Sequence, residues 1–202
     1  EISAVLAAVK NAEIAANVEE SINEPFISGE LKGAKVKKAK ETVYGATEWT
    51  LKNGVKVIVL PTQHKQDQVL FNLSFDGGKT LIATEDMPSF EDNIWALFQN
   101  NSGISKFSGT QVPKMLAGKN LSVTPYIGGT KHGISGSSTP KDLETALQLT
   151  YLYFADPRFD EDEYQTGIQQ ITAILPNIAN NPDFIFQNAM NKILYGNNPR
   201  VV

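Results

Sequence analysis

The spacing of apolar positions changes along the chain, and these changes predict an α+β fold. Between Ile2 and Ile27 the apolar residues recur at helical spacing, which predicts an amphipathic helix that ends near Pro25. Two β-rich runs then flank Asn53-Gly54, a dipeptide that favours the positive φ angles of a tight hairpin turn. A third run alternates apolar and polar residues from Val69 to Phe75, which predicts a half-buried strand.

The middle of the pattern predicts two helices and a further hairpin. One helix is expected after Pro88, and a short helix is expected to begin at the capping-box pair Ser108 and Gln111. Residues 121–134 alternate in polarity on both sides of Gly128-Gly129, which indicates a hairpin. The apolar face of the first helix would consist of four residues, Phe90, Ile94, Leu97 and Phe98.

Two longer helices follow. The first is expected to start at Thr139, an N-cap residue that precedes a first-turn proline and the acidic Asp142. Its pattern predicts one apolar face, made of Leu143, Leu147, Tyr151 and Phe154. The second helix starts in the acidic run Asp160 to Glu163, because the positive end of the helix dipole stabilises negative side chains. A calcium site would need a ligand spacing that this consecutive run lacks.

Composition narrows the function classes. Apolar residues make up 41% of the 202 residues, enough for a substantial core, and the formal charge of -4 argues against a nucleic-acid surface. The chain has no cysteine, which excludes disulfides, thiolate metal sites and cysteine nucleophiles. No apolar run reaches the roughly 20 residues that span a bilayer. Neither a phosphate-binding G-x-x-x-x-G-K-[ST] loop nor a G-x-S-x-G nucleophile elbow is present.

A cluster of lysines lies between the first helix and the first predicted strand. It consists of Lys35, Lys37, Lys38 and Lys40. An anion contact is one interpretation, but a solvated basic linker is the simpler one in an acidic chain. We therefore expect a helical linker with a basic loop over residues 1–42, and an α+β domain over residues 43–202.

The order of these motifs resembles the pitrilysin-type zinc metallopeptidases, the inverted zincins, which include insulysin and the mitochondrial processing peptidase. The resemblance covers about residues 47–200, and its most specific stretch is GISGSSTPKDLETALQLTYLYFADPRFDEDEY, from Gly133 to Tyr164. It implies a mixed or antiparallel sheet packed with helices, as in the metallohydrolase domain of the processing peptidase. Such domains repeat along the family's chains, whose two halves close around a peptide, and only one half carries zinc.

The zinc site of that family has no counterpart in this sequence. In the catalytic repeat, H-x-x-E-H supplies two histidine ligands and the glutamate that activates water, and a later glutamate is the third ligand. The resemblance places the H-x-x-E-H positions at Phe90, Asn93 and Ile94. It places the later glutamate near Gln169 or Gln170.

Only two histidines occur in the whole sequence. His64 and His132 lie in separate segments, so a histidine pair one helical turn apart is impossible, and both are expected at the surface. We therefore predict no catalytic and no metal-binding residue in this chain, and the resemblance implies zinc only in a parent enzyme.

The resemblance implies a non-catalytic domain, the third repeat of a two-half zinc peptidase, that forms part of the peptide-degradation chamber. Its expected partners are the catalytic half of the same polypeptide and the peptide substrate, with no nucleic acid and no membrane span. The alternative is a scaffold or peptide-binding protein of the same fold without proteolysis, like the core subunits of a respiratory complex. A third reading is an independent hydrolase that uses paired acids such as Asp160 and Glu163.

The resemblance leaves the substrate-binding residues open. The family holds substrate with an arginine and a tyrosine of its last repeat, which are not assigned to Arg158, Arg200 or Tyr195. Repeats of the family continue past YGNNPR through another helix and a strand, so the chain is expected to be a piece of a longer polypeptide. Its sheet would then be incomplete, with an exposed edge that can pair with another copy. Resemblance to bacterial members favours a periplasmic or cell-envelope setting.

Overall fold

The structure of the chain is a computed structural model, which describes residues 22, 24–87, 90, 101–196, 198 and 200. The helix predicted between Ile2 and Ile27 lies outside the described residues, apart from its last positions, and residues 24–27 are not helical. The helix predicted after Pro88 also lies outside them, apart from Phe90 and the helical residues 101–102.

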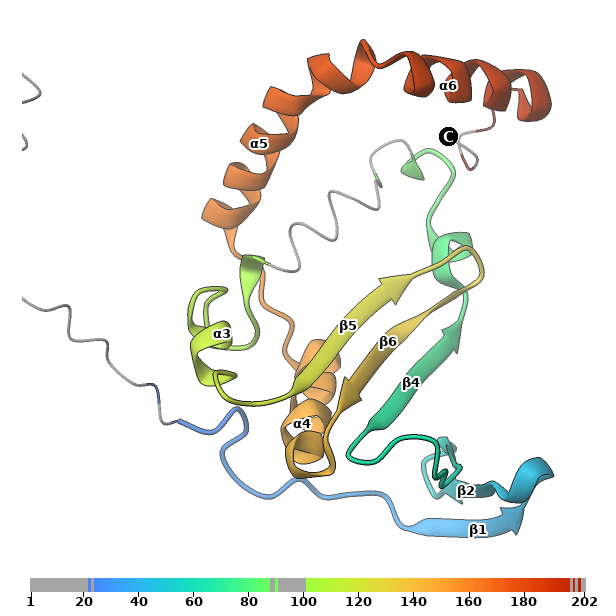
Figure 1. Cartoon of the computed structure of the whole chain (residues 1–202), viewed down its shortest axis with the longest axis vertical. Helices are drawn as coiled ribbons and strands as arrows, with labels where there is room; N and C mark the ends of the chain where they lie inside the picture. Colours follow the sequence, from blue (N-terminus) through green and yellow to red (C-terminus); the bar gives the residue numbers. More distant parts are fainter. Residues whose placement is uncertain are drawn as a thin grey trace, which may run out of the picture.

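The described residues form an α+β structure, as predicted, with two antiparallel sheets instead of one (Figure 1). The first sheet has the order β1-β2-β3, made of β1 (Val36–Glu41), β2 (Thr47–Leu51) and β3 (Lys56–Val59). The second has the order β4-β6-β5, made of β4 (Val69–Asp76), β5 (Leu121–Ile127) and β6 (Lys131–Ser138). The α-helices are α3 (Gln111–Met115), α4 (Leu143–Ala155), α5 (Glu161–Ala179) and α6 (Pro182–Tyr195), and the 3₁₀ helices are η1 (Val43–Gly45), η2 (Gly78–Leu81) and η4 (Pro140–Asp142).

Strand β1 corrects the prediction of a basic loop before residue 43. It pairs with β2 in antiparallel register, with Lys40 opposite Glu48 and Glu41 opposite Thr47. All of its residues are exposed, so backbone hydrogen bonds rather than burial hold it in place. The sequence pattern missed this strand because an exposed strand needs no alternation of polarity.

The hairpin predicted at Asn53-Gly54 is present, but its loop has three residues. The Leu51 N–H donates to the Val55 carbonyl at 2.8 Å, and the Gly54 N–H donates to the Leu51 carbonyl at 3.0 Å. Only Gly54 of the pair has a positive φ, 89°, while the Asn53 side chain accepts the Val55 N–H at 3.2 Å. This is the three-residue hairpin loop with glycine at its left-handed position.

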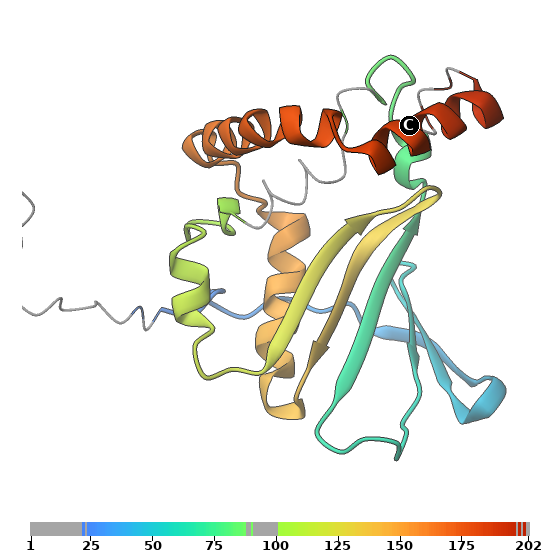
Figure 2. The same cartoon turned by 45° about the horizontal axis from the view of Figure 1, so that its top comes forward.

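The second sheet has one apolar and one polar face. Ile134 of β6 is 1% exposed and lies between Leu73 of β4 and Pro125 of β5. Because β5 is an edge strand, Pro125 is tolerated there. The opposite face carries exposed polar residues, such as Asn72 opposite Ser135. Helix α4 contacts β5 and β6, which covers the apolar face (Figure 2).

The core lies between this sheet, α4 and the segment that precedes β1. Its buried residues are Phe26, Ile104, Phe107, Leu149 and Leu152. Phe26 belongs to the stretch expected to be a linker, yet only 8% of it is exposed. Phe26 is therefore packed into the body of the domain, and the partly buried Ile22 and Ile27 pack against the same cluster.

The helix predicted to start at Thr139 begins there as the 3₁₀ helix η4 and continues as α4, but α4 buries a different face than predicted. Thr139 Oγ1 accepts the Asp142 N–H at 3.3 Å, and Pro140 occupies the first turn. The buried residues of α4 are Ala146, Leu149, Thr150 and Leu152. The face marked by the pattern is about half exposed, with Leu147 at 48%, Tyr151 at 46% and Phe154 at 49%. Helix α4 is apolar on two sides, so periodicity alone did not choose between them.

Helices α5 and α6 lie at one end of the molecule, and the first sheet lies at the other end (Figures 1 and 2). Asp160 caps α5 by accepting the Glu163 N–H at 3.3 Å, which confirms the predicted acidic helix start. Asn181 caps α6 by accepting the N–H groups of Asp183 and Phe184. Among the described residues, no helix is both long and apolar enough to cross a membrane.

Candidate functional site

The positions expected to match the family's zinc ligands carry no metal-binding pattern where the structure describes them. Phe90 is half-buried, and its N–H donates to the Met87 carbonyl at 3.0 Å. Asn93 and Ile94 lie outside the described residues. Gln169 and Gln170 are exposed on α5. A phenyl ring offers no lone pair to a metal, and an amide oxygen is a ligand suited to calcium rather than zinc.

The two histidines lie in different environments. His64 is exposed between β3 and β4, as predicted. His132, also predicted at the surface, is half-buried on β6. Its Nδ1 accepts the Gly78 N–H at 3.2 Å, and its ring stacks on Phe75 with centroids 5.7 Å apart. Strand β6 pairs with β4 as well as with β5, and a central strand buries its side chains more than a strand of a free hairpin does. The pairing of β6 with β4 is a long-range contact that the local sequence pattern does not show.

Within the described part of the chain, no three histidine, aspartate or glutamate side chains come together in a way that could hold a metal ion. The side chains that the structure describes therefore do not fit the zinc of the resembled family. The acidic run Asp160 to Glu163 serves the start of α5 instead. Its first carboxylate is engaged by Arg158, with 2.8 Å between Asp160 Oδ2 and Arg158 Nη2.

The backbone amides of the glycine turn after β4 form hydrogen bonds within the protein. The Gly77 N–H donates to the Thr130 carbonyl at 2.7 Å, and the Lys79 N–H donates to the Gly128 carbonyl at 2.8 Å. With the Gly78 N–H on His132, the amides of this turn are committed to the protein. The turn joins β4 to the β5–β6 hairpin and offers no free amides to an anion.

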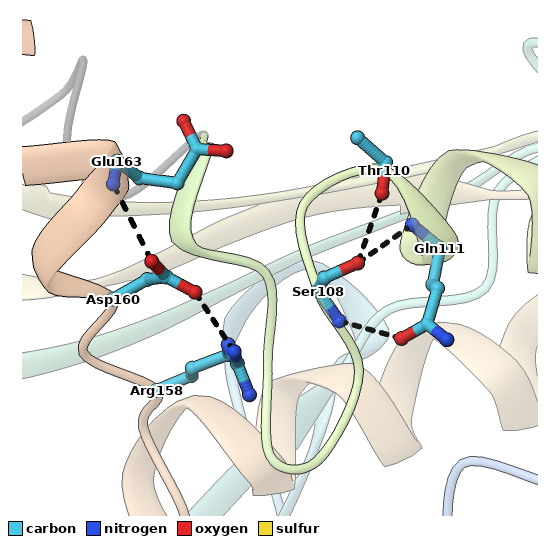
Figure 3. Close-up of polar contacts among 6 residues, drawn as sticks. All are labelled: Ser108, Thr110, Gln111, Arg158, Asp160 and Glu163. Atoms are coloured by element: carbon cyan, nitrogen blue, oxygen red, sulfur yellow. Dashed lines mark hydrogen bonds and ion pairs between the residues drawn. The ribbon is translucent and has the colours of Figure 1, made fainter. Parts of the chain in front are cut away.

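Helices α3 and α5 each begin with a network of capping hydrogen bonds (Figure 3). The predicted capping box is present: the Ser108 N–H donates to Gln111 Oε1 at 2.9 Å, and the Gln111 N–H donates to Ser108 Oγ at 3.3 Å. The Ser108 and Thr110 hydroxyls also lie 3.0 Å apart. On the α5 side, the Arg158 guanidinium and the Glu163 N–H hold the pKa of Asp160 below its ordinary value.

The loop before α3 is tied to its surroundings on two sides. Ser105 donates its hydroxyl to Asp156 Oδ2 at 2.6 Å and its N–H to the Asp156 carbonyl at 3.1 Å, which fixes the loop to the end of α4. Lys106 forms an ion pair with Glu24, beside the buried Phe26. The pair Ser105–Asp156 has no imidazole among its described contacts, so it lacks the general base of a serine nucleophile.

A buried carboxylate stabilises the start of α4. Asp142 is 6% exposed, and its Oδ2 accepts the Asn120 N–H at 2.9 Å and the Thr139 hydroxyl at 2.8 Å. The Asn120 N–H, followed by the Thr139 hydroxyl, lowers the pKa of Asp142. This carboxylate links the strand entry at Asn120 to the helix, and all of its described partners belong to the fold.

An open groove of about 600 Å³ lies between the segment 27–31 and the first half of α4. Its apolar lining includes Ile27, Leu31 and Leu147, and its acidic groups are Glu30 and Glu144. Such a lining can receive an apolar side chain, but it holds no nucleophile with a base. The described residues around this groove build supporting contacts and apolar surface.

Sequence reasoning missed one long-range contact in particular. Arg200 donates through Nη1 to the Lys79 carbonyl at 3.1 Å and through Nη2 to the Ile82 carbonyl at 2.8 Å. Nη2 also lies 2.9 Å from the Thr84 hydroxyl oxygen. This contact, which we call the Arg200 clasp, fastens the residues after α6 to the loop after β4. No local motif marks it, because its partners are more than a hundred residues apart.

Comparison with known proteins identifies the fold. The sequence matches no protein-family model and no curated protein. The structure is similar to the periplasmic protease PqqL from Escherichia coli, with a TM-score of 0.72 and 17% identity, over 100% of this chain and 22% of that one. It is also similar to the ferredoxin protease FusC, in complex with Arabidopsis ferredoxin, with a TM-score of 0.70 and 19% identity, over 96% of this chain and 22% of FusC.

A third similar structure is a protease from Helicobacter pylori, with a TM-score of 0.52 and 14% identity, over 75% of this chain and 34% of that one. The chain thus spans about a fifth of the length of the first two proteases. At these identities the similarity establishes the fold alone, and the chain has the α+β fold of part of these proteases.

Proposed function

We propose that this chain is a non-catalytic domain, a third repeat, of a zinc metallopeptidase of the pitrilysin type. The observation that carries the proposal is the similarity of the whole chain to a fifth of the protease PqqL, in a sequence that has no H-x-x-E-H. In this proposal the domain packs against the catalytic half and forms part of a peptide-degradation chamber. Zinc belongs to the catalytic half, and the parent acts in the periplasm or cell envelope.

Such a domain would contribute to proteolysis by enclosing the peptide substrate. A chamber wall orients a flexible peptide and excludes water, and both lower the barrier without a catalytic group from the wall. The described contacts suit a rigid wall. The Ser108–Gln111 caps, the Ser105–Asp156 bonds and the Arg200 clasp each fasten a loop to a neighbouring element.

We propose the α5–α6 end as the surface that meets the catalytic half. Its large apolar side chains are about half exposed or more, and such patches mark interaction surfaces in proteins. They include Ile174, Leu175, Ile178, Phe184, Ile185 and Phe186. A domain that packs against another half would cover them.

The first test compares this chain with its full polypeptide. Zinc binding is measured by isothermal titration, and cleavage is measured with a quenched fluorescent peptide. We expect zinc-dependent cleavage by the full polypeptide and neither zinc binding nor turnover by this chain. Turnover or stoichiometric zinc binding by this chain would refute the proposal. A full polypeptide that is silent in both assays would instead favour the scaffold function.

A second test addresses the docking surface in the full polypeptide. Ile185→Asp places a charge on the proposed interface and should lower peptidase activity by about tenfold or more, with the zinc content unchanged. Gln187→Asp places the same charge on a nearby exposed position of α6 and serves as the control. Equal effects of the two variants would remove the α5–α6 end as the interface.

A further inference from the structure

The first sheet is a basic region in an acidic chain. Residues 32–65 contain eight lysines and two acidic residues, a formal charge of +6, while the whole chain has -4. The sheet lies at the end of the molecule opposite α6 (Figures 1 and 2). It is therefore separate from the surface proposed above to meet the catalytic half.

Strand register places three of the lysines on one face of this sheet. Lys38 lies opposite Thr50, which in turn lies opposite Lys56, and Lys40 lies opposite Glu48. Glu48 is largely covered and forms an ion pair with Lys40 at 3.2 Å. Paired residues of an antiparallel sheet point to the same side. We call this side, with Lys38, Lys40 and Lys56, the basic face.

The end of the same sheet presents apolar side chains to solvent. The turn between β1 and β2 exposes 73% of Val43 and 91% of Tyr44, and Leu60, just after β3, is 49% exposed. Val59 lies opposite Thr47 in the register, so Leu60 follows β3 at the end where this turn lies. We call Val43, Tyr44 and Leu60 the apolar tip.

The turn that carries the apolar tip is held by hydrogen bonds. The Thr42 N–H and hydroxyl both donate to the Ala46 carbonyl, at 2.7 and 3.2 Å, and the Ala46 N–H donates to the Val43 carbonyl at 3.3 Å. Tyr44 adopts a φ of 62°, a left-handed conformation that is unfavourable for a tyrosine. The fold thus holds Val43 and Tyr44 outward at a conformational cost.

The shape and charge of this end of the sheet suit a lipid surface better than a protein partner. A protein partner of ordinary affinity covers about 800 Å² on each side with closely fitting contacts, whereas the tip is a narrow projection. A projection can enter the fluid headgroup region of a bilayer, where tyrosine rings are enriched. Lys38 and Lys56 each lie three residue positions along their strands from the pair Glu41–Thr47, which is at the tip end of the sheet. At the rise of a β-strand this separation is about 10 Å, close to one Debye length in physiological salt. Lys40, only one residue pair from Glu41–Thr47, is closer still.

We propose that the first sheet binds anionic lipid surfaces, with the apolar tip inserted among the headgroups and the basic face against the lipid charge. Apolar insertion and lysine attraction each contribute, and two such signals together give stable peripheral binding. Glu48, paired with Lys40 on the basic face, and Glu41, on the opposite face near the tip, both weaken the attraction, and residues 32–65 keep a formal charge of +6 with both acids counted. The inference concerns this chain itself and does not depend on the proposed peptidase function.

The experiment is co-sedimentation of the chain with two kinds of vesicle. One is pure phosphatidylcholine, and the other contains about one third phosphatidylglycerol, on which we expect at least about tenfold stronger binding. Raising the salt from about 50 mM to about 300 mM should weaken that binding, because the longer-range charge interactions become screened. Equal binding to both vesicles, or binding to neither, would overturn the proposal.

Matched variants locate the binding surface. The double variant Val43→Ser with Tyr44→Ser should weaken binding by about tenfold or more. Ile193→Ser with Leu194→Ser removes comparably exposed apolar side chains from α6 and should have no effect. Likewise, Lys38→Gln, Lys40→Gln and Lys56→Gln together should abolish the salt dependence, whereas Lys119→Gln, Lys141→Gln and Lys192→Gln should not.

Two further readouts keep the test decisive. Circular dichroism confirms that each variant is folded, and Tyr44→Trp should show a blue-shifted emission on anionic vesicles relative to the unsubstituted chain. An unshifted Tyr44→Trp emission would contradict insertion of the tip. Binding to polyglutamate without binding to vesicles would assign the surface to an acidic protein partner and overturn the lipid proposal.

Discussion

The ring of Phe26 packs edge-on against the ring of Phe107, with centroids 5.6 Å apart and planes at 79°. Phe26 comes from the stretch before the first strand, and Phe107 comes from the loop before α3. Ile104, Leu149 and Leu152 complete the cluster around them. The contact makes a segment with the composition of a linker part of the core.

The first prediction tests this contact. Phe26→Ala removes a buried ring and leaves a cavity, so the free energy of unfolding should fall by about 3 kcal/mol. Phe186→Ala removes a ring that is 60% exposed and is the control. Urea unfolding measures both. If the two variants lose the same stability, the segment around Phe26 is not part of the core.

A second prediction concerns the glycine turn after β4. Gly78 has a φ of 56°, and a Cβ there would collide with the backbone of Gly128 and lie 2.6 Å from the Lys131 nitrogen. Gly78→Ala should therefore destabilise the fold by about 2 kcal/mol or more. Gly129→Ala is the matched control, because a Cβ at that position meets nothing. Thermal unfolding that does not separate the two variants would contradict the described turn.

A third prediction concerns the stability of the fold at acidic pH. The pKa values of Asp142 and Asp160 are lowered in the folded chain from the ordinary 3.8, so each carboxylate binds protons more weakly when folded than when unfolded. Their stabilisation is complete well above pH 3.8 and is lost as the pH falls through the lower folded-state values. Melting temperatures measured from about pH 5 down to about pH 2 should therefore drop.

The variants Asp142→Asn and Asp160→Asn isolate that effect. Each should be less stable than the unsubstituted chain at neutral pH, because the charged hydrogen bonds are weakened, and each should show a smaller drop in acid. Asp183→Asn is the comparison, since Asp183 has an exposed side chain in the first turn of α6. A drop in acid that is unchanged in both Asp142→Asn and Asp160→Asn would assign the acid sensitivity to other groups.

A fourth prediction concerns the Arg200 clasp. Arg200→Gln removes a guanidinium that reaches two carbonyls and a hydroxyl at once, so the loop after β4 should open more often. Hydrogen exchange of the Thr80 and Ile82 amides should accelerate by about threefold or more, while global stability changes by less than about 1 kcal/mol. Lys192→Gln removes a positive charge on α6 and is the control. Unchanged exchange in Arg200→Gln would show that the clasp does not hold the loop.

Local chemistry was readable from the sequence. The Ser108–Gln111 box, the Thr139 cap and the Asp160 cap each join residues three positions apart, so the side chain meets its partner as soon as the helix forms. The hairpin at Asn53-Gly54 was readable for the same reason. Its loop length was not, because the register of the flanking strands sets it.

Long-range contacts were not readable. Arg200 meets Lys79 across 121 positions, and β1 forms only because β2 provides a partner for its backbone. His132 is half-buried because β6 became the central strand of its sheet. The buried face of α4 was undecided by periodicity, since both sides of the helix carry apolar residues.

By itself, the sequence determined the α+β class, the helix starts and the absence of an H-x-x-E-H motif, because these depend on residue identity and on neighbours a few positions away. Only the tertiary structure decided that Phe26 belongs to the core, that the Arg200 clasp fastens the end of the described chain and that the apolar tip projects beside a basic face. Each of these features requires contact between segments that are distant in the sequence. The free energy of that contact comes from burial of apolar side chains and from pairing of polar groups, which no local sequence pattern shows.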